Sequence, residues 1–268
     1  HDNLGIDPIK LEKYLKSIVK IKNGLCINRH TKRYIKGIIP VHMFGHPSKI
    51  KEIIKVAKKF NLFVLEDAAE ALGSFYKGKH LGTFSEIGIL SFNGNKIITT
   101  GGGGMILTKN KNLWKEANHL SKTAKVNHQF EFIHDNIGYN YRLPNLNAAL
   151  GLSQLSVLKK RIKNRRQLFH KYFKAFEKNY FAKIYKEPKF SISNYWLQTL
   201  LLNEDIKKHK NFILKHLNNN GYSCRPAWSL IHKLEIYKKS PKMKLKITED
   251  IYDKIINIPS SSFLNEEL

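Results

Sequence analysis

The sequence predicts an α/β fold with a mostly parallel sheet, helices on both faces of the sheet, and a smaller α+β domain at the C-terminal end. Three observations lead to this class. Strand and helix patterns alternate in the first half of the chain, a long helix with an apolar stripe follows, and short strands then alternate with helices. We expect a large domain over 1–155 and a small domain over 156–268 that begins in the long helix.

The first half of the chain predicts a βαβ unit. A buried strand over 37–43 ends in a turn, and a helix over 48–60 follows with Ser48 as its N-cap. A second apolar strand covers 62–65. Because parallel strands need a crossover connection, strand, helix and strand at this spacing predict a parallel sheet.

The remaining elements follow the same periodicities. Pro8 suits the first turn of an early helix, and Pro144 suits the first turn of the long helix. The segment over 74–84 is rich in turn residues and is expected to lie above the sheet. The other expected strands are IGILSF, MILT, NYWLQTLLL and GYSCRP, and the other expected helices are NKNLWKEANHLSK, DIKKHKNFILKHLNNNG and TEDIYDKII.

Composition excludes some classes of protein and leaves others open. The 268 residues carry a formal net charge of +26, which suits a nucleic-acid-binding module. The lysines, however, are scattered along the chain, and a positive field also attracts an anionic small substrate. The chain has 2 cysteines and no apolar run long enough to cross a bilayer, so we expect neither a disulfide framework nor a metal site, and we expect a cytoplasmic protein without membrane contact.

The stretch SFNGNKIITTGGGG sets Lys96 behind an apolar strand and next to four glycines. Asp67 follows another apolar strand, and ligands of open parallel sheets bind outside the carboxyl ends of the strands. The cofactor pyridoxal phosphate needs a lysine amine for its Schiff base and an aspartate for its pyridinium nitrogen. The glycines would let the backbone turn tightly beside this bulky group. These residues therefore suggest a pyridoxal phosphate site.

Each of these features also has an ordinary structural interpretation. Asp67 is suited to a turn or a helix cap, Lys96 to a solvated surface, and the glycines to a flexible hairpin tip. The glycine run lacks the order of a dinucleotide-binding fingerprint, and no Walker lysine is present. Physical reasoning from the residues leaves these alternatives open.

Three segments resemble the DegT/StrS-type sugar-nucleotide aminotransferases. They are VHMFGHP, LEDAAEALGSFYKGKHLGTFSEIGILSFNGNKIITTGGGGMILT and GYNYRLPNLNAALGLSQL, which occur in family order within 37–155. The glutamate after EDAA and the wording around the glycines are most similar to the LegC-like branch. The C-terminal stretches CRPAWSLIH and NIPSSS also fit. The resemblance implies the pyridoxal phosphate-dependent transferase fold of type I, which is similar to that of aspartate aminotransferase.

The resemblance implies roles for five residues near the cofactor. Lys96 would be the catalytic residue that carries the cofactor as a Schiff base, and Asp67 would pair with the pyridine nitrogen. Glu70 stands where many relatives have glutamine and would contact cofactor or substrate. Ser91 would hold the cofactor phosphate, and Asn93 stands where relatives often carry histidine.

Five further residues are implied at the edges of the site. Asn140 would reach the cofactor phosphate of a neighbouring subunit, and Arg142 of the same loop would contact substrate or hold the loop. His42 would contact cofactor or sugar, or fix the turn before residue 46. Trp228 and His232 would line the nucleotide end of the site, or serve ordinary packing.

The resemblance also implies an activity. The protein would transfer an amino group from glutamate to C4 of a UDP-linked 4-keto-6-deoxy sugar for surface polysaccharide, lipopolysaccharide or glycan biosynthesis, as a homodimer with shared active sites. Lys96 argues against the dehydratase variant of the family, which has histidine at this position. Relatives carry a further N-terminal segment that grips the cofactor phosphate, so this chain looks like a fragment, and we expect exposed apolar surface. A truncated, non-catalytic homologue and a basic nucleic-acid-binding module remain as alternatives.

Overall fold

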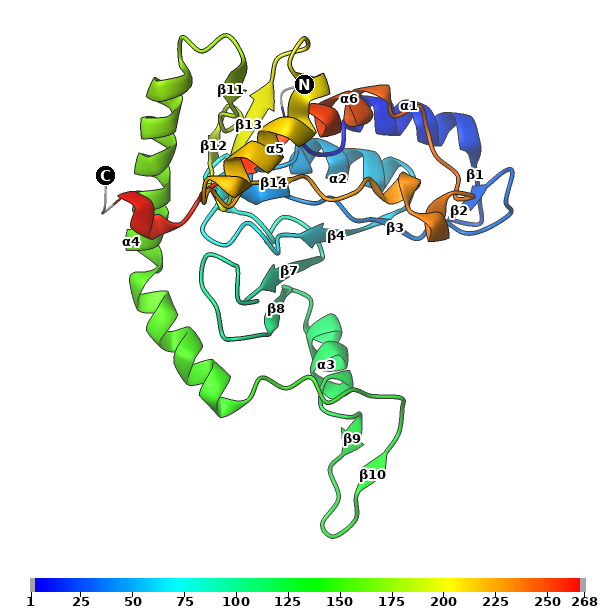
Figure 1. The fold of residues 1–268 in the computed structure, drawn as a ribbon. Helices are drawn as coiled ribbons and strands as arrows, with labels where there is room; N and C mark the ends of the chain where they lie inside the picture. Colours follow the sequence, from blue (N-terminus) through cyan, green and yellow to red (C-terminus); the bar gives the residue numbers. More distant parts are fainter. Residues whose placement is uncertain (1–2, 266–268) are drawn as a thin grey trace.

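A mixed four-stranded sheet forms the centre of the computed structural model, which describes residues 3–265 (Figure 1). Its strands run in the order β3 (Gly37–Ile38), β4 (Phe63–Asp67), β7 (Ile87–Ser91) and β8 (Gly104–Leu107). The pairs β3–β4 and β4–β7 are parallel, whereas β8 pairs antiparallel with β7. The expected α/β class with a mostly parallel sheet is confirmed.

Helices and hairpins surround this sheet. The helix α1 (Pro8–Ile18) begins at Asp7, whose carboxylate accepts the backbone N–H groups of residues 9 and 10. The helix α2 (Ile50–Lys59) buries an apolar stripe on the sheet side. Two hairpins that periodicity did not predict as strands are β1 (Val19–Lys22) with β2 (Leu25–Asn28), and β5 (Phe75–Tyr76) with β6 (Lys79–His80).

The expected strand over 37–43 is shorter than predicted. The ladder of β3 ends before Pro40, which has no N–H to donate, and a single 3₁₀ turn, η1 (Met43–Gly45), follows. Ser48 does not cap α2 as expected, since its backbone N–H and its hydroxyl both lie at the imidazole of His42. The turn between β3 and α2 is therefore organised by side-chain contacts.

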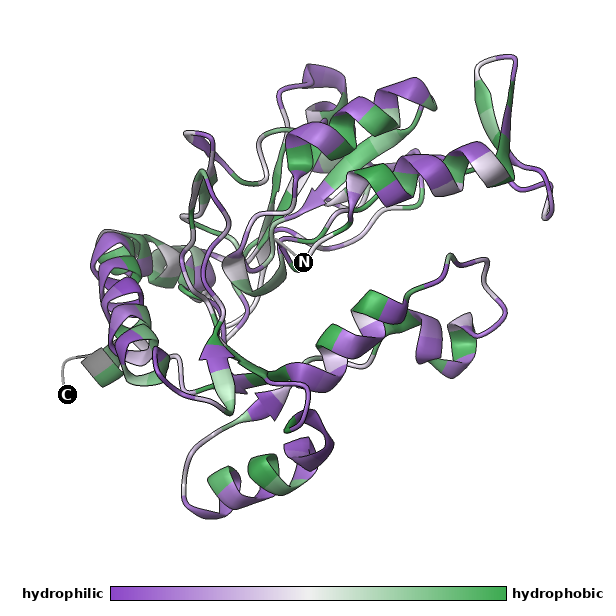
Figure 2. Ribbon diagram, turned by 90° about the horizontal axis from the view of Figure 1, so that it is seen from above, coloured by the Kyte–Doolittle hydropathy of each residue, from purple (hydrophilic) through white to green (hydrophobic). Residues whose placement is uncertain are grey.

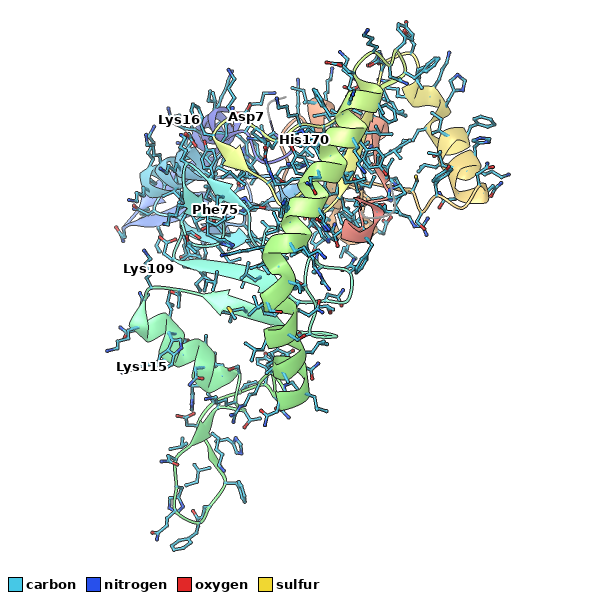
Figure 3. All side chains as sticks on the ribbon, turned by 90° about the vertical axis from the view of Figure 1, so that its left-hand side faces the viewer. Asp7, Lys16, Phe75, Lys109, Lys115 and His170 are labelled. Carbon is cyan, nitrogen blue, oxygen red and sulfur yellow. The ribbon has the colours of Figure 1, made fainter. Side chains whose placement is uncertain are left out.

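A long helix connects the two ends of the molecule. The helix α4 (Asn145–Phe176) runs along one side of the structure, as Figure 3 shows, with Pro144 as its N-cap. Below the sheet an arm carries α3 (Lys111–Leu120), β9 (Lys125–Val126) and β10 (Ile133–His134) (Figures 1 and 3). The arm precedes α4 in the chain and projects away from the remainder of the molecule.

The C-terminal part is built on an antiparallel sheet. Its strand order is β11 (Ala182–Ile184), β13 (Gln198–Leu202), β15 (Ile255–Ile258) and β14 (Arg225–Pro226). The helices α5 (Lys210–Asn219) and α6 (Lys246–Lys254) accompany it. Short 3₁₀ turns in this part are η2 (Lys207–His209), η3 (Ile231–Lys233), η4 (Glu235–Tyr237) and η5 (Ser262–Asn265). The strand β12 (Ser191–Ile192) instead pairs with β5 of the first part.

Two separate cores meet along α4. Leu158 packs against the core of the central sheet, and Phe169 belongs to the core of the C-terminal sheet. The domain boundary at residue 155 stays a prediction, and it lies within the continuous helix. Figure 2 shows the apolar and polar faces of the helices, and several apolar side chains of β8 and of the first half of α4 are exposed. Among the described residues, no helix has the length and apolar character needed to span a membrane.

Candidate active site

The carboxyl ends of β4 and β7 form the edge of the sheet at which the candidate residues meet. Asp67 is the last residue of β4, and Ser91 is the last residue of β7. The backbone of Asp67 is fixed on both sides, because its N–H donates to Pro40 O at 2.9 Å and its carbonyl accepts the N–H of His42 at 3.0 Å. Asp67 is thus held in place by the neighbouring parallel segment.

Lys96 lies in the loop that follows β7, and its side chain is only 13% exposed. Its Nζ is 3.9 Å from Oε1 of Glu70 and 4.0 Å from the ring centroid of Trp196. Burial lowers the pKa of Lys96, while the negative charges of Glu70 and Asp67 act in the opposite direction. The expected meeting of this lysine with the carboxylates is therefore found in the structure.

Glu70 lies just beyond β4, and its side chain is 11% exposed. Burial, helped by the negative charge of Asp67, raises the pKa of its carboxyl to about 7. The hydrogen bond from the Phe44 backbone N–H and the positive charge of Lys96 act in the opposite direction. The Phe44 N–H donates to Oε2 at 2.6 Å. Glu70 is thus a carboxyl that titrates near neutrality within reach of Lys96.

Aromatic rings from the C-terminal part close one side of this site. Trp196 is buried, and its indole N–H donates to Asn95 O at 2.8 Å, next to Lys96. Trp228 stacks on Trp196 with ring centroids 6.0 Å apart and an interplanar angle of 5°, and it also stacks on Phe44. Trp228 is 57% exposed and therefore offers a free aromatic surface beside the site.

Ser91 and Asn93 lie at the mouth of the same loop. The Ser91 hydroxyl accepts the backbone N–H of Asn93 at 3.3 Å, and the Asn93 side chain is exposed and contacts Asn95. The glycine run ends the loop, and Gly103 has φ +127°, a conformation that favours glycine. The sheet edge therefore presents a hydroxyl and an amide as hydrogen-bonding groups, beside a glycine backbone without side chains.

His42 is held by contacts inside the protein. The side chain is fully buried, its Nδ1 accepts the Ser48 N–H at 3.1 Å, and its Nε2 donates to Glu66 at 3.1 Å. Because both ring nitrogens are engaged inside the protein, these contacts support the expected role of His42 in fixing the turn after β3, and its contact with cofactor or sugar stays a prediction.

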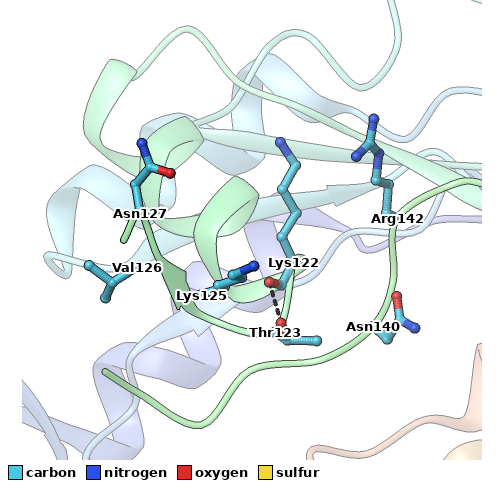
Figure 4. A pocket seen from close by; sticks show the side chains of 7 residues that line it. All are labelled: Lys122, Thr123, Lys125, Val126, Asn127, Asn140 and Arg142. Atoms are coloured by element: carbon cyan, nitrogen blue, oxygen red, sulfur yellow. Dashed lines mark hydrogen bonds between the residues drawn. The ribbon is translucent and has the colours of Figure 1, made fainter. Parts of the chain in front are cut away.

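Asn140 and Arg142 lie in the arm. They line a cavity of about 430 Å³ with Lys122, Lys125 and Asn127, and Figure 4 shows Lys122 and Arg142 extending in the same direction from neighbouring segments. None of the residues described in the neighbourhood of Lys96 lines this cavity. The structure of one chain therefore separates these two predicted residues from Lys96, which leaves the role of Asn140 across a subunit interface as a prediction.

His232 also has a partner within the chain. Its Nε2 lies 2.9 Å from Oε1 of Glu249 in α6, and its side chain is 13% exposed. Trp228 is thus joined to the Lys96 site through Trp196, whereas His232 contacts α6. Their expected roles at a nucleotide stay predictions.

Sequence reasoning missed two buried residues at the site, Asn194 and Trp196, and it placed Glu66 at a strand end without assigning its contacts. Asn194 donates to the carbonyls of Glu70 and Leu72 at 2.9 Å and accepts the N–H of Trp196 at 2.8 Å. Glu66 accepts hydrogen bonds from His42 and from the segment over 82–85. The signal for Asn194 and Trp196 was present in SNYW, an asparagine and a tryptophan just before an apolar strand.

The donors at the sheet edge fit pyridoxal phosphate. An amine shielded from solvent, a carboxylate at the adjacent strand end, and a hydroxyl and amide at the loop mouth are the groups that an aldehyde, a pyridine nitrogen and a phosphate require. In residues 3–265 no group of three or more histidine, cysteine, aspartate or glutamate side chains is arranged to hold a metal ion.

The fold and the residues gathered at this sheet edge define the class of the protein as an α/β fold of the pyridoxal phosphate-dependent transferase type. The chain belongs to the DegT/DnrJ/EryC1/StrS aminotransferase family, which matches residues 9–268. The family resemblance inferred from sequence is confirmed, and with it the fold of type I.

Individual relatives support the same assignment. The chain is 38% identical to GDP-perosamine synthase of Escherichia coli O157:H7 over 232 residues, which are 87% of this chain and 62% of that protein. It is 36% identical over 239 residues to the putative pyridoxal phosphate-dependent aminotransferase EpsN of Bacillus subtilis, covering 87% of this chain and 60% of that protein. The structure of Helicobacter pylori PseC, an aminotransferase of pseudoaminic acid biosynthesis, superimposes with a TM-score of 0.85 at 28% identity, covering 98% of this chain and 67% of PseC. The chain thus spans less than two thirds of the length of these two curated relatives.

Proposed function

We propose that the protein is a pyridoxal phosphate-dependent aminotransferase that converts a nucleotide-linked 4-keto-6-deoxy sugar into the 4-amino sugar, with glutamate as amino donor. The observation that carries this proposal is the short distance between the Lys96 amine and the Glu70 carboxyl. Both lie at the edge of the sheet where strand β4 ends with Asp67. Membership of the aminotransferase family and the names of the relatives support the type of reaction.

Bound pyridoxal phosphate would supply an electron sink for the electron pair left on the α-carbon when the amino donor loses its proton. Lys96 would hold the cofactor and, when its amine is free, move a proton at the reacting carbon. To do so the amine must be neutral for part of the cycle, and burial of Lys96 favours the neutral form. Lys96 thus combines attachment and proton transfer.

The other residues would bind and orient. The carboxylate of Asp67 would accept a hydrogen bond from the protonated ring nitrogen, since its backbone is fixed between Pro40 and His42. Ser91 and Asn93 would donate hydrogen bonds to the phosphate. Trp196 and Trp228 would exclude water from one side of the site and offer an aromatic face to the substrate.

We further propose that the active protein is a homodimer. Asn140 and Arg142 lie on the arm in a cavity of cationic and amide side chains, which suits the phosphate groups of a cofactor or nucleotide held by a second subunit. The exposed apolar side chains of α4 would be covered in the same assembly.

The proposal also specifies the nucleotide to which the sugar substrate is linked. The sequence suggested a UDP-linked sugar, whereas the named relatives include both a GDP-perosamine synthase and, at 31% identity over 264 residues, a UDP-4-amino-4,6-dideoxy-N-acetyl-beta-L-altrosamine transaminase of Campylobacter jejuni. We propose the UDP sugar and treat the GDP sugar as the alternative that the experiment decides.

The experiment begins with the purified protein and pyridoxal phosphate. Borohydride reduction followed by peptide mapping should find the cofactor mass on Lys96, and glutamate with a UDP-linked 4-keto-6-deoxy sugar should yield the 4-amino sugar. Lys96→Ala should abolish both the adduct and turnover, because no other amine lies at this place, whereas Lys111→Ala on the exposed side of α3 should retain both. Turnover by Lys96→Ala would overturn the assignment.

A non-catalytic homologue of the same fold is the second candidate. It predicts a cofactor adduct at Lys96 without turnover of either nucleotide sugar. The same assay therefore distinguishes the two functions.

A further inference from the structure

The carboxyl of Glu70 has its two oxygens in different surroundings. Oε2 accepts the backbone N–H of Phe44 at 2.6 Å, and Phe44 has φ +57°, a conformation that a bulky residue rarely adopts. Oε1 lies 3.9 Å from Nζ of Lys96. One oxygen is therefore anchored to the backbone, and the other faces the lysine amine.

The position of Glu70 is fixed from the C-terminal part of the chain. The fully buried side chain of Asn194 donates to the carbonyl of Glu70 and accepts the N–H of Trp196. Trp196 in turn has its ring face 4.0 Å from Nζ of Lys96. One asparagine thus holds the backbones of the two residues whose carboxyl and aromatic face lie near the same amine, which indicates a prepared position for that amine.

We propose that Glu70 is the proton-exchange partner of Lys96, and that Glu70 and the face of Trp196 together hold the amine whenever it is free. In this step the ammonium of Lys96 loses a proton, the N–H electron pair stays on Nζ, and Oε1 of Glu70 gains the proton; the reverse step restores the ammonium. The separation of 3.9 Å exceeds a hydrogen bond, so the transfer needs a small rotation of the Lys96 side chain or one bridging water.

The local charges suit this exchange. The charged groups that face Glu70 are Lys96 from the loop after β7 and Asp67 from β4, while Asn194 and Trp196 are neutral. The Glu70 carboxyl, with a pKa of about 7, can both accept and return a proton near neutral pH. A glutamine at this position would keep the shape of the side chain and lose the exchange.

The inference deepens the proposed function and rests on it, but its test does not require turnover. The rate at which Lys96 reacts with a water-soluble amine reagent is measured against pH by peptide mass spectrometry, in the wild-type protein without added cofactor and in Glu70→Gln. Removal of the carboxylate that favours the ammonium should lower the pKa of Lys96 by about one unit and raise its reaction rate at pH 8 roughly tenfold. Lys111 on α3 is the reference in each digest.

Controls separate the possible outcomes. Glu116→Gln, an exposed change on α3, should leave the Lys96 rate unchanged, and Glu70→Asp should restore most of the wild-type rate because it keeps the charge. A Glu70→Gln rate within twofold of wild type would overturn the proposal. The absence of a borohydride-fixed adduct at Lys96 in the wild type would instead overturn the proposed function.

A second measurement applies if Glu70→Gln does not fold. The carboxyl carbon of Glu70 is titrated by ¹³C NMR in the wild type and in Lys96→Met. Loss of the lysine charge should shift this titration to higher pH, because Lys96 lowers the pKa of Glu70. An unshifted titration would show that the two groups do not interact and would overturn the proposal.

Discussion

Burial sets the chemistry of single side chains in this protein, and its outcome depends on the available partners. Burial lowers the pKa of Lys96 but leaves it two carboxylates as counter-charges. Glu66 is buried too, yet hydrogen bonds from His42, Ser85 and Gly82 outweigh burial and hold its pKa below the usual range. At the residue scale, the hydrogen-bond donors around a buried group decide whether it stays charged.

His46 shows the opposite case. It is buried between the rings of Tyr185 and Tyr195, with ring centroids 4.9 and 5.1 Å away, and within the described part of the chain neither of its ring nitrogens has a hydrogen-bond partner. Burial, helped by the charge of Arg166, lowers the pKa of His46 to about 3. His46 is therefore neutral in the folded protein at every pH at which the protein would work.

We predict a pH-dependent stability from His46. Because its pKa is lower in the folded than in the unfolded chain, its contribution is fully present above about pH 6.5 and is lost as the pH falls toward 3. At pH 5 the loss should be about 2 kcal/mol, since only the unfolded chain binds the proton. His46→Phe should reduce the difference between the unfolding free energies at pH 7.5 and pH 5 by this amount, measured by urea denaturation. The exposed change His30→Phe serves as control, and an equal pH dependence in His46→Phe and wild type would contradict the prediction.

At the scale of elements, the loop over 81–85 is tied to two strands of the central sheet. Glu66 of β4 accepts backbone N–H groups of Gly82, Phe84 and Ser85 at 2.6–2.8 Å. The same loop passes directly over β7, where a Cβ added to Gly88 would lie 1.9 Å from the carbonyl oxygen of Gly82. The loop can lie close to the sheet because Glu66 of β4 accepts its N–H groups and Gly88 of β7 has no side chain to block it.

We predict that Gly88→Ala destabilises the protein strongly. A methyl group at this position meets backbone and not a flexible side chain, so β7 or the loop must move, at a cost of about 3 kcal/mol in the free energy of unfolding. Gly94→Ala is the matched control, because nothing lies within 4 Å of its added Cβ. Urea denaturation of both variants measures the difference, and equal stabilities would show that the loop is free to shift.

At the scale of the whole molecule, the arm and the first half of α4 expose apolar side chains. Leu146 and Leu152 of α4 are 87% and 73% exposed, and the arm exposes Phe130 and Phe132. Exposed apolar side chains of this kind are typical of an interface. The proposed dimer would cover it, and would bring the cationic cavity of the arm to a second subunit.

We predict that Leu152→Glu shifts the protein from dimer to monomer. A charge at the centre of an apolar interface loses its hydration without a partner, so association should weaken by at least tenfold. Light scattering after size-exclusion chromatography measures the mass, and Lys171→Glu in the second half of α4 is the control. A wild-type protein that is monomeric at all concentrations would refute the dimer itself.

Much of the first half of the fold was predictable from local patterns. The helix α2 and the strands β4 and β7 bury residues at the spacings that the sequence shows. The reason is that each of these elements packs one side against the core. The hairpin of β1 and β2 was missed, since strand β1 buries only Val19 and strand β2 alternates over just four residues. The ends of β3 and the cap of α2 were wrong because Pro40 and His42 redirect the backbone.

The candidate site divides in the same way. Lys96 and Asp67 were expected at one edge because strand ends of a parallel sheet meet there, whereas Glu70 was implied only by the family resemblance. For His42 the role of fixing the turn was one of two expectations. Its partners Glu66 and Ser48 were not predictable, since they meet its nitrogens only in the folded chain. Trp196 was also missed as a site residue, because its contact with Lys96 spans 100 positions of the chain.

The sequence by itself determined the class of fold, the family, and the identity of the lysine and of the carboxylates at the strand ends, because these follow from periodicity and from residues close together in the chain. Only the tertiary structure decided which groups are charged, which nitrogens are already engaged, and that Asn194 holds the backbones of Glu70 and Trp196 near Lys96. Protonation and contact depend on burial and on partners far apart in the chain, and both arise only when the two cores along α4 come together.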